Sequence, residues 1–133
     1  DAAFVNTDFS TSDLEGLLDA TLAEAAAHAT NTYYVSVKVK NASLGNDVNM
    51  HDTYETELAS AALWKAENVA TGAQITVTGV TSNAAGYFNV VLDSTAYAAL
   101  SNGAAIKISL AAPSVLDAAG VTGIEGLALS VVK

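Results

Sequence analysis

The segment from Tyr33 to Lys40 alternates apolar and polar residues, and this pattern constrains the fold more than any other feature of the chain. One face of the implied strand carries Tyr33, Val35, Val37 and Val39, and the other carries Tyr34, Ser36, Lys38 and Lys40. Antiparallel sheets with one face on a core produce this period of two. The segment is therefore predicted to be a strand of such a sheet.

Further strands follow at short spacing along the chain. Residues 74–81 and 86–92 predict a hairpin around the turn at 82–85, in which Ile75 and Val77 face the apolar residues of the second strand. Residues 105–110 and 126–132 are also predicted to be strands. Short strands separated by turn signals predict a mainly β fold, an antiparallel β-sandwich.

The N-terminal quarter has a different pattern and is predicted to hold the one α-helix of the fold. Ser12-Asp13-Leu14-Glu15 matches a capping box, in which a hydroxyl and a carboxylate satisfy each other's backbone N–H groups. Leucines follow at helical spacing, so a helix is predicted over residues 12–29, with Gly16 costing it about 1 kcal/mol. His28 would lie in the last turn, where the helix dipole favours an imidazole.

The middle of the chain is less regular. Residues 41–53 are polar and are predicted to form a loop. Residues 53–68 fit either a helix capped at Asp52 or a strand, and a strand over 61–67 is favoured. A loop is predicted to open at Pro113, with one helical turn over 114–119.

Composition sets the class of protein. The 133 residues predict a single domain over 1–133, made of a possible assembly arm (1–10), the helix (12–29) and the sandwich (33–133). Fourteen acidic residues against five lysines, with no arginine, give a net charge of −9. Neither nucleic acid nor an anionic membrane surface is therefore an expected partner. No apolar run is long enough for a membrane-spanning helix, and the absence of cysteine excludes disulfides and thiolate chemistry.

The stretch from Asn68 to Leu92 resembles a known kind of module. Asn68-Val69-Ala70-Thr71-Gly72 and Thr81-Ser82-Asn83-Ala84-Ala85-Gly86-Tyr87-Phe88 are similar to the turns and strands of transthyretin-like or collagen-adhesin B-type repeats. The resemblance implies an Ig-like or transthyretin-like β-sandwich with a structural or adhesive role and no catalytic residue. It also implies a hypothesis of a Lys–Asn cross-link, with Lys38 or Lys40 beside Glu55 or Glu57.

A polar cluster at residues 46–52 suggests metal binding. Asp47, Asn49, His51 and Asp52 place oxygen and nitrogen ligands at close spacing. An EF-hand is excluded, because the sixth position lacks Gly and the twelfth, Leu58, is not acidic. A calcium site of another kind and a solvated loop both remain open, with the loop preferred and no cofactor otherwise expected.

Aromatic residues suggest a second alternative, a carbohydrate-binding or adhesive module. Sugar rings stack on exposed aromatic side chains beside polar groups, and Tyr54 and Trp64 with Asp52 are the candidates.

The leading functional expectation is a non-enzymatic subunit. No nucleophile, carboxylate-pair or phosphate-loop motif is recognisable, so an enzyme is not expected. The chain begins at Asp1 and is rich in small residues, which favours a secreted or cell-surface protein. Phe4, Val5 and Phe9 form an apolar arm that would add as a strand to a sheet edge of the next copy, giving a filament, layer or virion-like shell. The partner would then be the chain itself, with a glycan as the alternative.

Overall fold

The computed structural model describes residues 14–19, 32–41, 48–49, 51–82, 86–111 and 128–133. The elements of the first half are β1 (Leu14–Asp19), β2 (Tyr33–Asn41), β3 (Val48–Asn49), α1 (His51–Leu58), the 3-10 helix η4 (Ala61–Leu63) and β4 (Trp64–Asn68). Those of the second half are β5 (Gln74–Ile75), β6 (Val77–Ser82), β7 (Phe88–Leu92), α2 (Ser94–Ala98), β8 (Ala105–Leu110) and β9 (Ala128–Val132).

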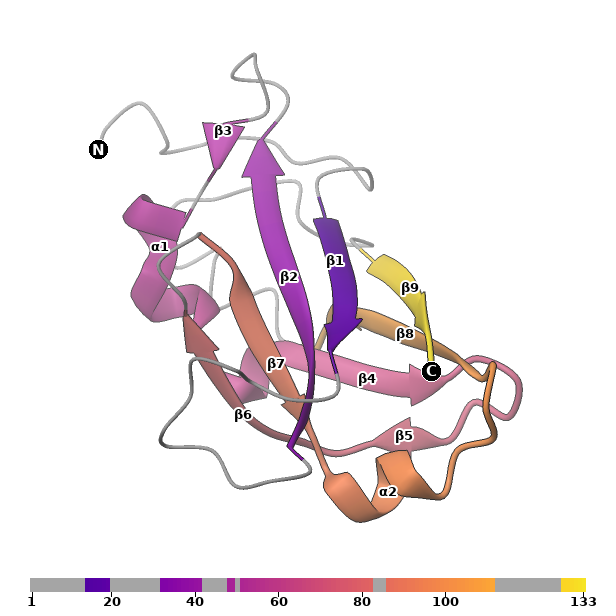
Figure 1. Cartoon of the computed structure of the whole chain (residues 1–133). Helices are drawn as coiled ribbons and strands as arrows, with labels where there is room; N and C mark the ends of the chain where they lie inside the picture. Colours follow the sequence, from indigo (N-terminus) through magenta and orange to yellow (C-terminus); the bar gives the residue numbers. More distant parts are fainter. Residues whose placement is uncertain (1–13, 20–31, 42–47, 50, 83–85, 112–127) are drawn as a thin grey trace.

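These strands form two antiparallel sheets, as Figure 1 shows. The first sheet has the order β1-β2-β7-β6, with β3 added to β2, and the second has the order β5-β4-β8-β9. The chain passes from one sheet to the other between Ile75 and Val77, and on the opposite side β1 lies beside β9. The prediction of a mainly β, antiparallel fold is confirmed.

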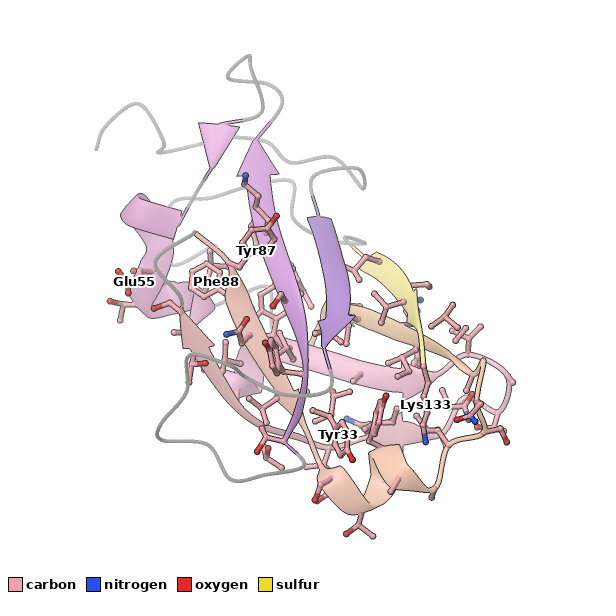
Figure 2. The ribbon with its side chains drawn as sticks, in the orientation of Figure 1. Tyr33, Glu55, Tyr87, Phe88 and Lys133 are labelled. Carbon is pink, nitrogen blue, oxygen red and sulfur yellow. The ribbon has the colours of Figure 1, made fainter. Side chains whose placement is uncertain are left out.

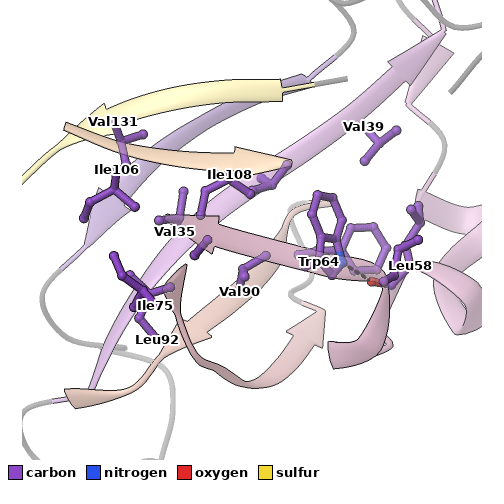
Figure 3. Packing of buried hydrophobic residues seen from close by; sticks show 14 of the residues in the cluster. Val35, Val39, Leu58, Trp64, Ile75, Val90, Leu92, Ile106, Ile108 and Val131 are labelled. Carbon is purple, nitrogen blue, oxygen red and sulfur yellow. Dashed lines mark hydrogen bonds between the residues drawn. The ribbon is translucent and has the colours of Figure 1, made fainter. Parts of the chain in front are cut away.

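One hydrophobic core lies between the sheets (Figure 3). Val35, Val37 and Val39 of β2 are almost fully buried in it, so the predicted alternation of that strand is confirmed. The second sheet contributes Ile106 and Ile108 of β8. Residues from both sheets fill this core. The opposite face of each sheet therefore points away from the core.

The predicted pairing of the hairpin strands is confirmed, whereas residues 83–85 of its turn lie outside the described residues. β6 pairs with β7 from Val77↔Leu92 to Ser82↔Phe88, with a bulge between Val77 and Gly79. Ile75, however, belongs to the other sheet, where it pairs with Ala66. Gly86 has φ of 87° and Gly72 has φ of 72°, in the left-handed region that glycine adopts without steric cost.

The prediction of a helix over residues 12–29 is wrong where the structure describes it. Residues 14–19 form strand β1, which pairs antiparallel with β2 from Leu14↔Val39 to Asp19↔Tyr34. The leucine spacing fits both periods over such a short stretch, and Gly16 weakens the helix. Backbone pairing to the edge of β2 overrides the local helix preference. Residues 20–29, including His28, and the capping residues Ser12 and Asp13 lie outside the described residues.

The segment 41–68 corrects two more predictions. Residues 48–49 pair with β2, and residues 51–58 form α1, so 41–53 is not one loop. The ambiguous stretch is divided between the two alternatives, with a helix first and a strand, β4, from Trp64. Burial accompanies the change, because Leu58 at the end of α1, Leu63 and Trp64 all lie in the core. The predicted strand at 105–110 is found as β8, and the strand predicted at 126–132 is found as β9 over 128–132. Residues 126–127 and the predicted turn at 114–119 lie outside the described residues.

Candidate functional site

The side chains of the four proposed metal ligands, Asp47, Asn49, His51 and Asp52, lie outside the description, so a calcium site there stays a prediction. Asn49 ends β3 and pairs with Lys40, whereas His51 and Asp52 lie in the first turn of α1. Asp47 is outside the described residues. Among the described residues, no group of three His, Asp or Glu side chains is placed to hold a metal ion.

Trp64 cannot serve as a sugar-stacking platform, which corrects that part of the carbohydrate hypothesis. Only 3% of its surface is exposed. Its indole Nε1 donates a 2.8 Å hydrogen bond to the carbonyl oxygen of Leu58, the last residue of α1. Trp64 therefore joins the end of α1 to β4 inside the core (Figure 3). Tyr54 lies in the middle of α1, and its side chain is outside the description.

Two of the residues proposed for a Lys–Asn cross-link, Lys38 and Glu55, have other partners. The Lys38 Nζ lies 5.7 Å from the centroid of the Tyr87 ring, a cation–π contact between neighbouring strands. A Glu55 carboxylate oxygen accepts a 2.8 Å hydrogen bond from the Ser82 hydroxyl, which ties α1 to the end of β6. In the described residues, Glu55 thus holds an edge strand.

The outward face of the first sheet is largely buried. Tyr34 and Val91, paired across β2 and β7, form a small apolar cluster separate from the main core. Next to them, the Ser36 hydroxyl donates a 2.7 Å hydrogen bond to the Asn89 amide oxygen, and both residues are buried. This face does not present an open surface at the centre of the sheet.

The outward face of the second sheet carries two accessible lysines. Lys65 on β4 and Lys107 on β8 have side chains 41% and 45% exposed. Each ammonium lies 3.8 Å from a carboxylate oxygen of Glu67, which stands between them. Pairs this long and exposed contribute little to stability, so the lysines keep their capacity to meet another acidic group.

β6 is an edge strand with an unusual composition. Its sequence, Val-Thr-Gly-Val-Thr-Ser, is rich in β-branched residues and holds no charge. Within the described residues it pairs with β7 alone. Natural proteins commonly protect such edges with lysine, proline or bulges. In β6, the bulge lies near one end and the Ser82–Glu55 hydrogen bond lies at the other. The exposed Thr81 lies between these two features.

The best-defined polar site of the described chain surrounds the ammonium of Lys133. Its Nζ donates to the carbonyl oxygens of Tyr97 at 3.0 Å, Ala98 at 3.4 Å and Leu100 at 2.7 Å. It also lies 4.7 Å from the centroid of the Tyr97 ring. These carbonyls belong to the C-terminal end of α2, where a cation is favourable. Figure 2 shows Lys133 and Tyr33 at this end of the molecule and Glu55 near the opposite end.

We call the Lys133 ammonium and its partners Tyr97, Ala98 and Leu100 the Lys133 clasp. Tyr97 connects this clasp to the first sheet. Its ring stacks on that of Tyr33 with centroids 4.1 Å apart. Burial, and to a lesser degree the neighbouring Tyr33, raises the pKa of the Tyr97 hydroxyl above its ordinary value of 10.0. The clasp thus joins α2, the start of β2 and the end of β9. The residues of the clasp were not singled out from the sequence. Asp93 caps the start of α2, where its carboxylate accepts a 2.9 Å hydrogen bond from the Ala96 N–H, and an Asp before a short helix is a signal that could have located α2.

Comparison of the chain with protein-family models, curated proteins and solved structures finds no significant match. In the part of the chain that the structure describes, no helix is both long and apolar enough to cross a membrane. The proposed arm residues Phe4, Val5 and Phe9 lie outside that part.

Proposed function

We propose that this protein is a non-enzymatic, extracellular structural subunit that self-assembles into a filament, layer or virion-like shell. The edge strand β6 carries the proposal. It is six residues long, uncharged and paired on one side only among the described residues. The unpaired N–H and C=O groups of such an edge accept an added strand from another chain.

The donor in this proposal is the N-terminal arm, residues 1–10. Phe4 and Val5 supply adjacent apolar side chains, and Phe9 adds a second anchor. Backbone hydrogen bonds would provide strength, and alternate side chains would set the register. Because donor and acceptor are different surfaces, the contact is heterologous. Repetition of a heterologous contact produces either a ring or an open filament.

The fold is compatible with a role in assembly but does not by itself specify that role. We propose that the two sheets form an Ig-like or transthyretin-like sandwich of the kind common in surface modules. The shared core, the hairpin β6–β7 and the turn glycines at 72 and 86 support this more specific assignment. The carbohydrate-binding alternative is weakened because Trp64 is buried. Among the described side chains, no exposed aromatic residue could take its place.

The test uses the native chain, a variant lacking residues 1–10 and the edge variant Thr81→Lys. Thr81 is exposed, and a lysine on an edge strand opposes pairing with another chain. Ser101→Lys is the matched control, because it adds the same charge at an exposed position away from β6. Negative-stain electron microscopy and light scattering would measure assembly, and circular dichroism would check folding.

We expect ordered assemblies from the native chain and from Ser101→Lys, and folded monomers from the other two variants. A native chain that stays monomeric, or a deletion variant that assembles normally, would overturn the proposal. A monomer that binds a glycan would favour the alternative function.

A further inference from the structure

We propose that the outward face of the sheet β5-β4-β8-β9 is a second docking surface, and that its occupant is the acidic helix α1 of another copy of this chain. This inference rests on the proposed function in that both contacts join copies of the subunit. Its basic face is separate from β6 and the arm, but α1 touches β6 through the Ser82–Glu55 hydrogen bond, so substitution of the lysines, and not of α1, separates the two contacts. It would add a lateral contact to the strand-addition contact.

The first observation is a difference between the two outward faces. On the first sheet, Tyr34 and Asn89 are only 4% and 2% exposed, so that face is already covered. On the second sheet, the corresponding face remains accessible at Lys65, Lys107 and Ser130. At the centre of the described strands, the second face is therefore more accessible to another molecule than the first.

The second observation is an apolar row on that open face. Val69 and Val132 are the exposed large hydrophobic residues of the described chain, at 52% and 62%. They flank the same residue, because the Val69 N–H donates to the Ala105 carbonyl oxygen and Ala105 pairs with Val132. Removing this row from water on docking would favour association.

The third observation is charge complementarity, which selects the occupant. The strands of the second sheet carry Lys65 and Lys107 against a single acid, Glu67, in a chain whose net charge is −9. α1 carries Asp52, Glu55 and Glu57 and no basic residue in its last turn. Glu55 is exposed and Glu57 is half-buried. Copies of so acidic a chain repel one another in most orientations, so association favours the one that places this basic face on an acidic helix.

The experiment exploits this complementarity by exchanging the charges in the full-length chain. Variant A carries Lys65→Glu and Lys107→Glu, and variant B carries Glu55→Lys and Glu57→Lys. In each variant alone, the sheet face and α1 carry charges of the same sign and repel. In a mixture of A and B, the face of each variant meets an α1 of opposite charge on the other. Lys38→Glu is the control for a single charge reversal on the other sheet, and it is compared with Lys65→Glu and Lys107→Glu made one at a time. Sedimentation velocity at low and high salt measures the association constant.

We expect A alone and B alone to associate at least tenfold more weakly than the native chain at low salt, and the A–B mixture to recover the native value. Lys38→Glu should be unchanged, Val132→Ser should weaken association at both salt concentrations, and salt should weaken the native contact. The inference fails if variant A associates like the native chain, if the mixture shows no recovery, or if the native chain is monomeric throughout.

The two proposals fail in distinguishable ways. Loss of assembly in the variant lacking residues 1–10, with variant A unchanged, would retain strand addition and remove the lateral contact. Loss in variant A, with the deletion variant unchanged, would retain the lateral contact and remove the arm.

Discussion

Replacing Lys133 with Met removes the ammonium from the clasp while retaining a flexible side chain of similar length. The Nζ donates to three carbonyl oxygens at the end of α2, of which the 2.7 Å bond to Leu100 is the shortest. Hydrogen bonds from a charged group contribute about 1.5–3 kcal/mol, and a partly exposed cation–π contact adds about 0.5–1 kcal/mol. Because Lys133 is half-buried, we take the lower part of this range, about 2 kcal/mol.

The corresponding change in melting temperature follows from the size of the chain. Unfolding entropy is about 2.1 cal/mol/K per residue, so 133 residues give about 0.28 kcal/mol/K. A loss of about 2 kcal/mol then lowers the Tm by about 7 °C. Differential scanning calorimetry and urea unfolding would measure both quantities, with Lys65→Met as the control, since the ammonium of Lys65 makes a long, exposed ion pair with Glu67. Equal stability of Lys133→Met and Lys65→Met would refute the importance of the clasp.

Three further predictions concern buried polar groups. The raised pKa of Tyr97 means that the stability it confers is fully present below about pH 10, the unfolded value, and is lost as the pH rises through the folded value. Tyr97→Phe should therefore flatten the decline of unfolding free energy above pH 10, and a decline identical to native would contradict the assignment. Trp64→Phe leaves the Leu58 carbonyl without its indole donor and should cost about 1–3 kcal/mol in urea unfolding, whereas a neutral result would argue against burial. Ser36→Ala should cost about 1–3 kcal/mol by removing the donor to the buried Asn89 oxygen, and the cost should shrink when Asn89 is replaced by Leu in the same chain.

Strand prediction from the sequence succeeds where one face of the strand meets the core. The alternation at residues 33–39 and the apolar residues of 105–110 reflect burial between two sheets, and both strands are found where the pattern places them. The hairpin β6–β7 is predictable because turn residues separate two apolar segments. These patterns are local, so a single sequence reveals them.

Features that depend on distant partners are not predictable in this way. The leucines of residues 14–19 have helical spacing, yet the segment pairs with the edge of β2 as a strand. Trp64 is aromatic like any sugar platform, but its indole N–H meets a carbonyl six residues away inside the core. The contacts of Lys133 lie more than thirty positions back along the chain, at Tyr97 and Leu100. No spacing rule joins such positions.

Cross-linking between copies tests strand addition most directly, because the native chain contains no cysteine. One copy would carry Phe4→Cys and the other Thr81→Cys, and the two would be mixed under assembly conditions and oxidised. The account predicts a disulfide-linked heterodimer from this pair and little from Phe4→Cys with Ser130→Cys, an exposed position on the other sheet. Equal cross-linking to both positions, or none to Thr81→Cys in material that assembles, would contradict addition of the arm to β6.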